Sequence, residues 1–157
     1  MLFELRRPYY REYQDNVEPI LSNVRFLESL PKDIPVGLVT RTPEDRVRAL
    51  MQRFALPVSR FGVLTCMPQK DVSKTQMYEI TASRLRVRLD QCVAVEDTET
   101  GVTDAGRAGA SQGQRMALVI ACPTPMTAAQ DFGAADLVVR GGLLRLQALA
   151  GVLGQMS

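Results

Sequence analysis

Residues 92–110 read CVAVEDTETGVTDAGRAGA. An apolar run ends on two adjacent carboxylates, Glu96 and Asp97, and a run rich in glycine and alanine follows at once. The apolar run predicts a buried strand over 91–96, and the small residues predict a helix over 98–109 that packs closely against it. Because charge at the tip of a buried strand costs solvation free energy, the two acids need a partner that offsets this cost.

Similar apolar runs alternate with amphipathic segments along most of the chain. The sequence predicts strands at 34–40, 61–65, 91–96, 116–120 and 136–139. It predicts helices at 3–14, 17–30, 43–55, 73–86, 98–109 and 143–153, with a short helix or turn after Pro125. Near-continuous apolar strands separated by helices are typical of a parallel sheet with helices on both faces. We therefore predict a doubly wound, three-layer α/β domain of the Rossmann-like kind.

Two of these helices have recognisable start signals. Thr42 is the expected N-cap of the helix at 43–55, with Pro43 at its first position. Ser73 is the expected N-cap of the next helix, and Gln76 stands three positions later, as a capping box requires.

Composition excludes several classes of function. The chain has 157 residues, 46% of them hydrophobic and 23% charged, which fits one globular domain. Its formal net charge is only +2, so neither nucleic acid nor an acidic membrane surface is indicated as a partner. No apolar stretch approaches the roughly 20 residues that span a bilayer. The absence of histidine removes Ser–His and Cys–His pairs and every histidine-ligated metal site.

The three cysteines, at positions 66, 92 and 122, lack metal-ligand spacing. We interpret them as reduced thiols of a cytoplasmic protein. The sequence gives no indication of the oligomeric state.

The carboxyl ends of parallel strands meet at one edge of a sheet, where ligands bind. Thr40, Arg41, Cys66, Glu96 and Asp97 all lie at such ends. Paired carboxylates there suit Mg²⁺, which prefers oxygen ligands. The alternative is that Asp97, or the threonine after it, only caps the next helix. Thr40 could bind a phosphoryl oxygen, or it could simply end a strand.

Two lysines follow the strand predicted at 61–65. Lys70 and Lys74 stand in the loop and the first turn of the next helix, where either could neutralise an anion. The alternative is that both merely solvate the surface, as most loop lysines do.

The combination resembles the haloacid dehalogenase-like hydrolases, especially phosphoglycolate-phosphatase and β-phosphoglucomutase-like members. The resemblance runs from about residue 17 to the C-terminus. The run E-D-T-x-x-G at 96–101, followed by small residues, resembles the fourth motif of the family, and VGLVT at 36–40 resembles the second. The later AADLVV at 134–139, followed by a terminal helix, is also typical.

The resemblance implies phosphoryl transfer through an aspartyl-phosphate intermediate with Mg²⁺, on a small phosphorylated metabolite. It implies that Asp97 ligates the metal directly and that Glu96 is its partner or an outer-shell acid. Thr40 and Arg41 would bind phosphoryl oxygens, and a lysine would steady the developing charge.

The identity of that lysine stays open, because the family usually has Lys-Pro before the helix and this chain has no such pair. The distance along the chain from Phe61 favours Lys74, whereas position relative to the helix cap favours Lys70. We take Lys74 as the first candidate.

The chain departs from the family at its front. The nucleophile of the family lies in a D-x-D motif that ends the first strand, and no D-x-D occurs in this sequence. We therefore expect residues 1–16 to be the helix that returns from a missing cap, and 17–157 to be the core without its first strand. In the family that strand lies between the strands matching 34–40 and 91–96. Its loss would leave two strand edges unpaired or force those strands to pair directly.

The sequence thus predicts a fragment or a decayed relative of a Mg²⁺-dependent phosphatase or phosphomutase, inactive on its own because the aspartate nucleophile is absent. The alternative is a non-catalytic pseudoenzyme that binds a partner or a phosphorylated ligand. A phospho-accepting receiver domain uses similar residue types, but there the acids follow the first strand and the lysine the last. This chain has the reverse order.

Overall fold

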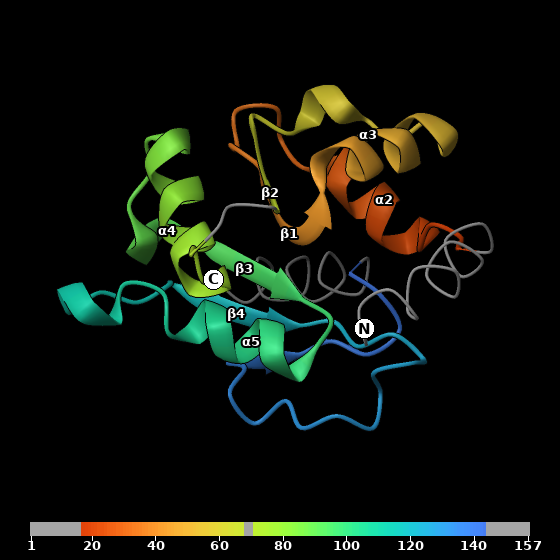
Figure 1. Cartoon of the computed structure of the whole chain (residues 1–157). Coiled ribbons are helices and arrows are strands. Elements are labelled where there is room, and N and C mark those ends of the chain that lie inside the picture. Colours follow the sequence, from red (N-terminus) through yellow and green to blue (C-terminus); the bar gives the residue numbers. More distant parts are fainter. Residues whose placement is uncertain (1–16, 68–70, 144–157) are drawn as a thin grey trace, which may run out of the picture.

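The computed structural model describes residues 17–67 and 71–143 (Figure 1). The helices predicted at 3–14 and, beyond residue 143, at 143–153 lie outside these residues, as does Lys70. In the part of the chain described, no helix is long and apolar enough to cross a membrane.

The first sheet has two parallel strands, β1 (Gly37–Pro43) and β2 (Val63–Met67). Leu38 lies opposite Leu64 and Thr40 opposite Cys66, and the register shifts after Thr40. The helix α3 (Glu44–Arg53) packs on one face and α4 (Lys74–Leu85) on the other. This part of the molecule therefore has the three layers expected from the alternation of strands and helices.

The second sheet has three strands, β3 (Val93–Glu96), β4 (Leu118–Ala121) and β5 (Leu137–Val138), in the order β3-β4-β5. Every pair is parallel, as predicted. The helix α5 (Glu99–Gly106) covers one face of β3 and β4 and also contacts α4. The remaining elements are α2 (Leu21–Ser29) and three short 3₁₀ helices, η1 (Val58–Arg60), η2 (Leu89–Gln91) and η3 (Ala110–Gln112).

The strands form two sheets rather than the single sheet that the pattern of apolar runs predicts. Within the described residues no backbone ladder joins β1 to β3, so each of these strands has one edge without a strand neighbour there. In Figure 1, β1 and β2 lie above β3 and β4, and α4 lies beside both pairs. The resemblance described above predicts either such unpaired edges or a direct pairing of these two strands.

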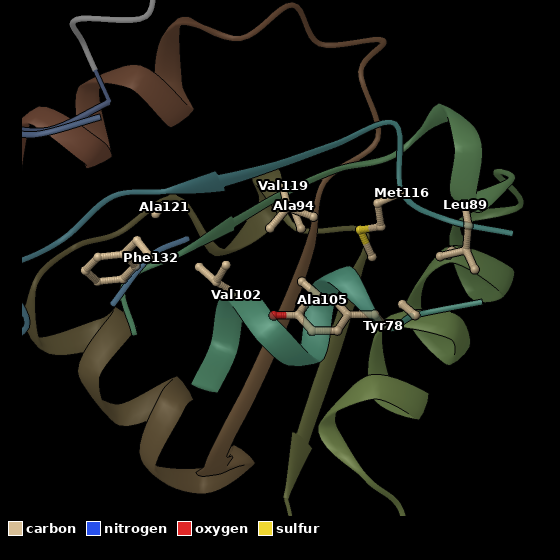
Figure 2. Close-up of a cluster of buried hydrophobic side chains, with 11 residues drawn as sticks. Tyr78, Leu89, Ala94, Val102, Ala105, Met116, Val119, Ala121 and Phe132 are labelled. Carbon is tan, nitrogen blue, oxygen red and sulfur yellow. The ribbon is translucent and has the colours of Figure 1, made fainter. Parts of the chain in front are cut away.

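A single cluster of buried side chains joins α4 and α5 to the second sheet (Figure 2). Val102 and Ala105 of α5 face Ala94 and Val119 of the strands, and both helix residues are completely buried. Val39 of β1 packs against the same cluster, which places β1 next to the second sheet. The small residues after the acidic pair thus allow the close helix-to-strand packing that the sequence predicts.

The N-terminus of α4 has the predicted capping box. The Ser73 hydroxyl accepts a hydrogen bond from the Gln76 backbone N–H at 3.1 Å, and the Gln76 side chain accepts one from the Ser73 backbone N–H at 2.8 Å. These two bonds satisfy donors that a helix start would otherwise leave unpaired. They also fix the point at which Lys74 enters the helix.

We expect Ser73→Ala to lower the free energy of unfolding by about 1 kcal/mol, because the helix loses its cap. Ser83→Ala is the matched control, since Ser83 is an exposed residue of the same helix. Urea unfolding followed by circular dichroism measures both. Equal stability of the two variants would contradict a stabilising role for the capping box.

The N-cap predicted for α3 is wrong by one residue. Pro43 is the N-cap and ends β1, and no side chain caps the helix, so Thr42 lies in the strand. The physical reason is that a residue before proline is restricted to extended conformations, so Thr42 stays in the strand and cannot start the helix. The backbone N–H of Thr42 donates instead to the Thr40 hydroxyl oxygen at 3.1 Å.

Candidate functional site

The carboxyl ends of β1 and β3 carry the residues that the sequence nominates. Thr40 is a half-buried residue of β1, and its hydroxyl oxygen accepts the Thr42 N–H. Arg41 follows it, with its side chain 60% exposed. Glu96 ends β3 and is buried, whereas Asp97 is exposed. The two acids therefore meet very different surroundings, although they are adjacent in the sequence.

Two side chains of α4 offset the cost of burying the Glu96 carboxylate. The Lys74 ammonium lies 2.7 Å from Glu96 Oε1, and these two side chains are only 13% and 7% exposed. The Tyr78 hydroxyl donates a hydrogen bond to the same Glu96 oxygen. One carboxylate oxygen thus receives two donors from successive turns of one helix. These two donors offset the cost of burying a charge at the end of the strand.

The Tyr78 phenol stays protonated, so it is the donor in its hydrogen bond with Glu96. Burial raises the pKa of Tyr78 well above its ordinary value, and the negative charge of Glu96 and the hydrogen bond to it raise the pKa further. The ring packs in the buried cluster, and the Lys74 ammonium lies 5.9 Å from its centroid. The phenol therefore keeps its proton at neutral pH and acts as the donor in this hydrogen bond.

The other carboxylate oxygen of Glu96 faces Gly101. A Cβ at Gly101 would lie 2.6 Å from the Glu96 carboxyl carbon and 2.9 Å from the Thr98 hydroxyl oxygen. Thr98 is the N-cap of α5, because its hydroxyl accepts the Gly101 N–H at 3.1 Å. Of the two residues that could cap this helix, Thr98 does so, and Asp97 is left free for another role.

Asp97 has an exposed carboxylate, and the described part of the chain shows no hydrogen bond or ion pair to it. Carboxylate oxygen is the ligand type that Mg²⁺ prefers. Glu96 fits less well as a direct ligand, because both donors already occupy one of its oxygens. Across residues 17–67 and 71–143, no group of three acidic, cysteine or histidine side chains is placed to hold a metal ion.

A second polar cluster joins β1 to the two helices. Asp104 of α5 accepts hydrogen bonds from the Arg41 guanidinium and from the Thr75 hydroxyl, each at 3.4 Å. These contacts connect the end of β1 to the first turn of α4 through α5. They bring Arg41 and the Lys74 turn to the same side of the molecule.

Cys66, the remaining residue at a strand end, does not share this chemistry. It is buried in a second apolar cluster with Val47 and Met51 of α3. Burial raises the pKa of the Cys66 thiol, and the nearby Glu44 carboxylate raises it further. A protonated, buried thiol is a poor nucleophile, so Cys66 serves packing.

Sequence reasoning missed Tyr78, Thr75 and Asp104. The signal for Tyr78 was present, because it stands four positions after Lys74 and therefore on the same helix face. No local signal identifies Asp104, whose partners are distant in the sequence.

Comparisons with known proteins agree with this architecture. No family model matches the sequence, and no curated protein matches it significantly. A crystal structure from Thermotoga maritima, of a protein assigned as a beta-phosphoglucomutase, superimposes with a TM-score of 0.64 at 22% identity. The match covers 91% of this chain and 65% of that one.

Two crystal structures of CbbY from Rhodobacter sphaeroides also match, each with a TM-score of 0.56 at 23% identity. One holds phosphate, and the other is a mutant that holds xylulose-1,5-bisphosphate. Each match covers 76% of this chain and 49% of CbbY, so the chain spans about half the length of these proteins. The likeness confirms the α/β fold with parallel strands that the sequence predicts, because this chain shares that fold with these solved structures.

Proposed function

We propose that the carboxyl ends of β1 and β3 are the phosphate- and metal-binding part of a phosphohydrolase or phosphomutase site of the haloacid dehalogenase type. The observation that carries this proposal is the buried ion pair at 2.7 Å between Lys74 and Glu96, beside the exposed Asp97. A fixed cation next to a free carboxylate suits a phosphate that is shared with a divalent metal ion.

Each residue has a separate part in this proposal. The Thr40 hydroxyl and the Arg41 guanidinium bind phosphoryl oxygens, and the Lys74 ammonium neutralises their charge. Asp97 is the direct metal ligand, while Glu96 acts at one remove by holding Lys74. Mg²⁺, when bound, would polarise the phosphoryl group as a Lewis acid.

The substrate that we propose is a small phosphorylated metabolite of the cytoplasm. Support for the phosphate comes from the CbbY structures, which hold phosphate and a sugar bisphosphate. Support for the compartment comes from Cys66, Cys92 and Cys122, which are free thiols rather than disulfides.

Catalysis needs one group more than these residues supply. No D-x-D motif occurs in the 157 residues, so the sequence has no counterpart of the aspartate that forms the covalent intermediate. This observation favours a second candidate function, in which the chain binds a phosphorylated ligand through the same residues without turning it over.

We expect the chain to release no nitrophenol from p-nitrophenyl phosphate above the buffer rate, with or without Mg²⁺, because water alone forfeits the covalent route. Absorbance of the product measures this. Turnover that Asp97→Asn abolishes would contradict the prediction.

Calorimetric titration with inorganic phosphate tests the binding part of the proposal. We expect Mg²⁺ to strengthen phosphate binding, and Asp97→Asn to weaken the Mg²⁺-dependent binding by at least about tenfold, since even outer-shell partners of metal ligands contribute that much. Asp45→Asn is the matched control, because Asp45 is an exposed acid on α3. Equal loss in both variants, or no phosphate binding by the unaltered chain, would contradict the proposed function.

A further inference from the structure

We propose that Tyr78 is a positioning residue: its hydroxyl holds the Glu96 carboxylate in the orientation that receives the Lys74 ammonium, and so fixes where that ammonium faces a bound anion. The proposal rests on the proposed function for the identity of the anion. The arrangement of the three side chains is independent of it.

The geometry singles out the hydroxyl rather than the ring. Lys74 and Tyr78 stand one turn apart on α4, and both donate to Glu96 Oε1. A lysine side chain has several rotatable bonds and three donors, so a single ion pair leaves it considerable freedom. A second donor from a rigid, buried ring removes the freedom of the carboxylate, and through the carboxylate that of the ammonium.

Burial makes this constraint effective. Tyr78 is 6% exposed, Glu96 8% and the Lys74 side chain 13%, so water competes little for any of these bonds. Gly101 lies against the second oxygen of the Glu96 carboxylate, so closely that even a Cβ at this position would overlap the carboxylate. The position of the Lys74 ammonium is therefore fixed by Glu96 and Tyr78.

Tyr78→Phe tests the proposal because it keeps the ring and removes only the hydroxyl. Thr81→Val is the matched control. Thr81 is buried on the same helix and its hydroxyl bonds to Thr65 at 2.6 Å, but it does not touch the Lys74–Glu96 pair. The control therefore separates the loss of any buried hydroxyl from the loss of this one.

The first measurement is the rate at which an N-hydroxysuccinimide acetyl ester acylates Lys74 in the full chain, mapped by mass spectrometry with the exposed Lys32 as internal reference. A hydrogen bond to a charged group is worth about tenfold in an equilibrium. We therefore expect Tyr78→Phe to raise the relative acylation rate of Lys74 about tenfold and Thr81→Val to change it less than about twofold. Equal rates in Tyr78→Phe and the unaltered chain would overturn the proposal.

The second measurement is the dissociation constant of inorganic phosphate with Mg²⁺ present. We expect Tyr78→Phe to raise it about tenfold at unchanged stoichiometry, with Thr81→Val unchanged. An unchanged dissociation constant in Tyr78→Phe would overturn the positioning role toward the anion. If the unaltered chain binds no phosphate, the proposed function fails, and the acylation rates still decide whether Tyr78 positions Lys74.

Discussion

Replacing Lys74 with methionine is expected to lower the free energy of unfolding by about 3–5 kcal/mol, the largest loss among the variants considered for this chain. The methionine keeps most of the apolar stem and removes the charge. Glu96 then remains at the buried tip of β3 with Tyr78 as its donor and no cation. A buried carboxylate without its counter-charge is costly, because the solvation lost on folding is no longer repaid.

The surface pair between Arg48 and Glu44 is the matched control. Its atoms are 2.6 Å apart, as close as those of the buried pair, but the two side chains are 56% and 51% exposed. Exposed ion pairs contribute at most about 1 kcal/mol, so Arg48→Met should cost little. Urea unfolding of both variants compares the same kind of contact in two environments.

A double variant isolates the charge itself. Lys74→Met combined with Glu96→Gln removes both charges, and the glutamine can still accept the Tyr78 hydrogen bond. We expect the double variant to be more stable than Lys74→Met alone, because no unpaired charge remains in the core. If Lys74→Met lowers the free energy of unfolding no more than Arg48→Met does, the ion pair does not offset the burial of Glu96. The proposal that Glu96 fixes Lys74 in the site then fails as well.

The parts of the site that sequence reasoning located are the ones set by local chemistry. The capping box at Ser73 and Gln76 depends on residues three positions apart, and it forms as predicted. The acidic pair at the end of β3 likewise follows from one apolar run and its abrupt end. The α/β fold with parallel strands was predictable for the same reason, because the alternation of apolar runs and amphipathic segments indicates it.

The parts that sequence reasoning missed depend on contacts between distant elements. Glu96 and Tyr78 are 18 positions apart, and Arg41 and Asp104 are 63 apart. Hydrophobic periodicity places these residues on faces of elements but does not say which faces meet. The division into two sheets is of the same kind, since it depends on which strand edges find partners rather than on any strand alone.

The difference between Glu96 and Asp97 shows why adjacent acids need a structure to separate their roles. Glu96 is the last residue of β3 and its side chain is buried against α4 and α5, whereas Asp97 lies in the bend after the strand and is exposed. The sequence presents the two as a pair of oxygen ligands. The fold gives one of them two donors and leaves the other free.

Gly101→Ala is expected to lower the free energy of unfolding by about 2–4 kcal/mol, although alanine favours a helix more than glycine does. The added methyl group would overlap the Glu96 carboxylate and approach the Thr98 hydroxyl oxygen at 2.9 Å. Glu96 cannot move aside freely, because Lys74 and Tyr78 hold it. Relief of the overlap therefore breaks either these bonds or the cap of α5.

Gly106→Ala, in the same helix, separates this overlap from helix propensity. A Cβ at Gly106 would meet only the Ala134 carbonyl oxygen, at an ordinary 3.9 Å. We therefore expect Gly106→Ala to raise the free energy of unfolding by up to about 1 kcal/mol, opposite in sign to Gly101→Ala. Thermal and urea unfolding of both variants test the contrast. If both glycines tolerate alanine, the carboxylate of Glu96 is free to turn, and neither Lys74 nor Tyr78 can be said to fix it.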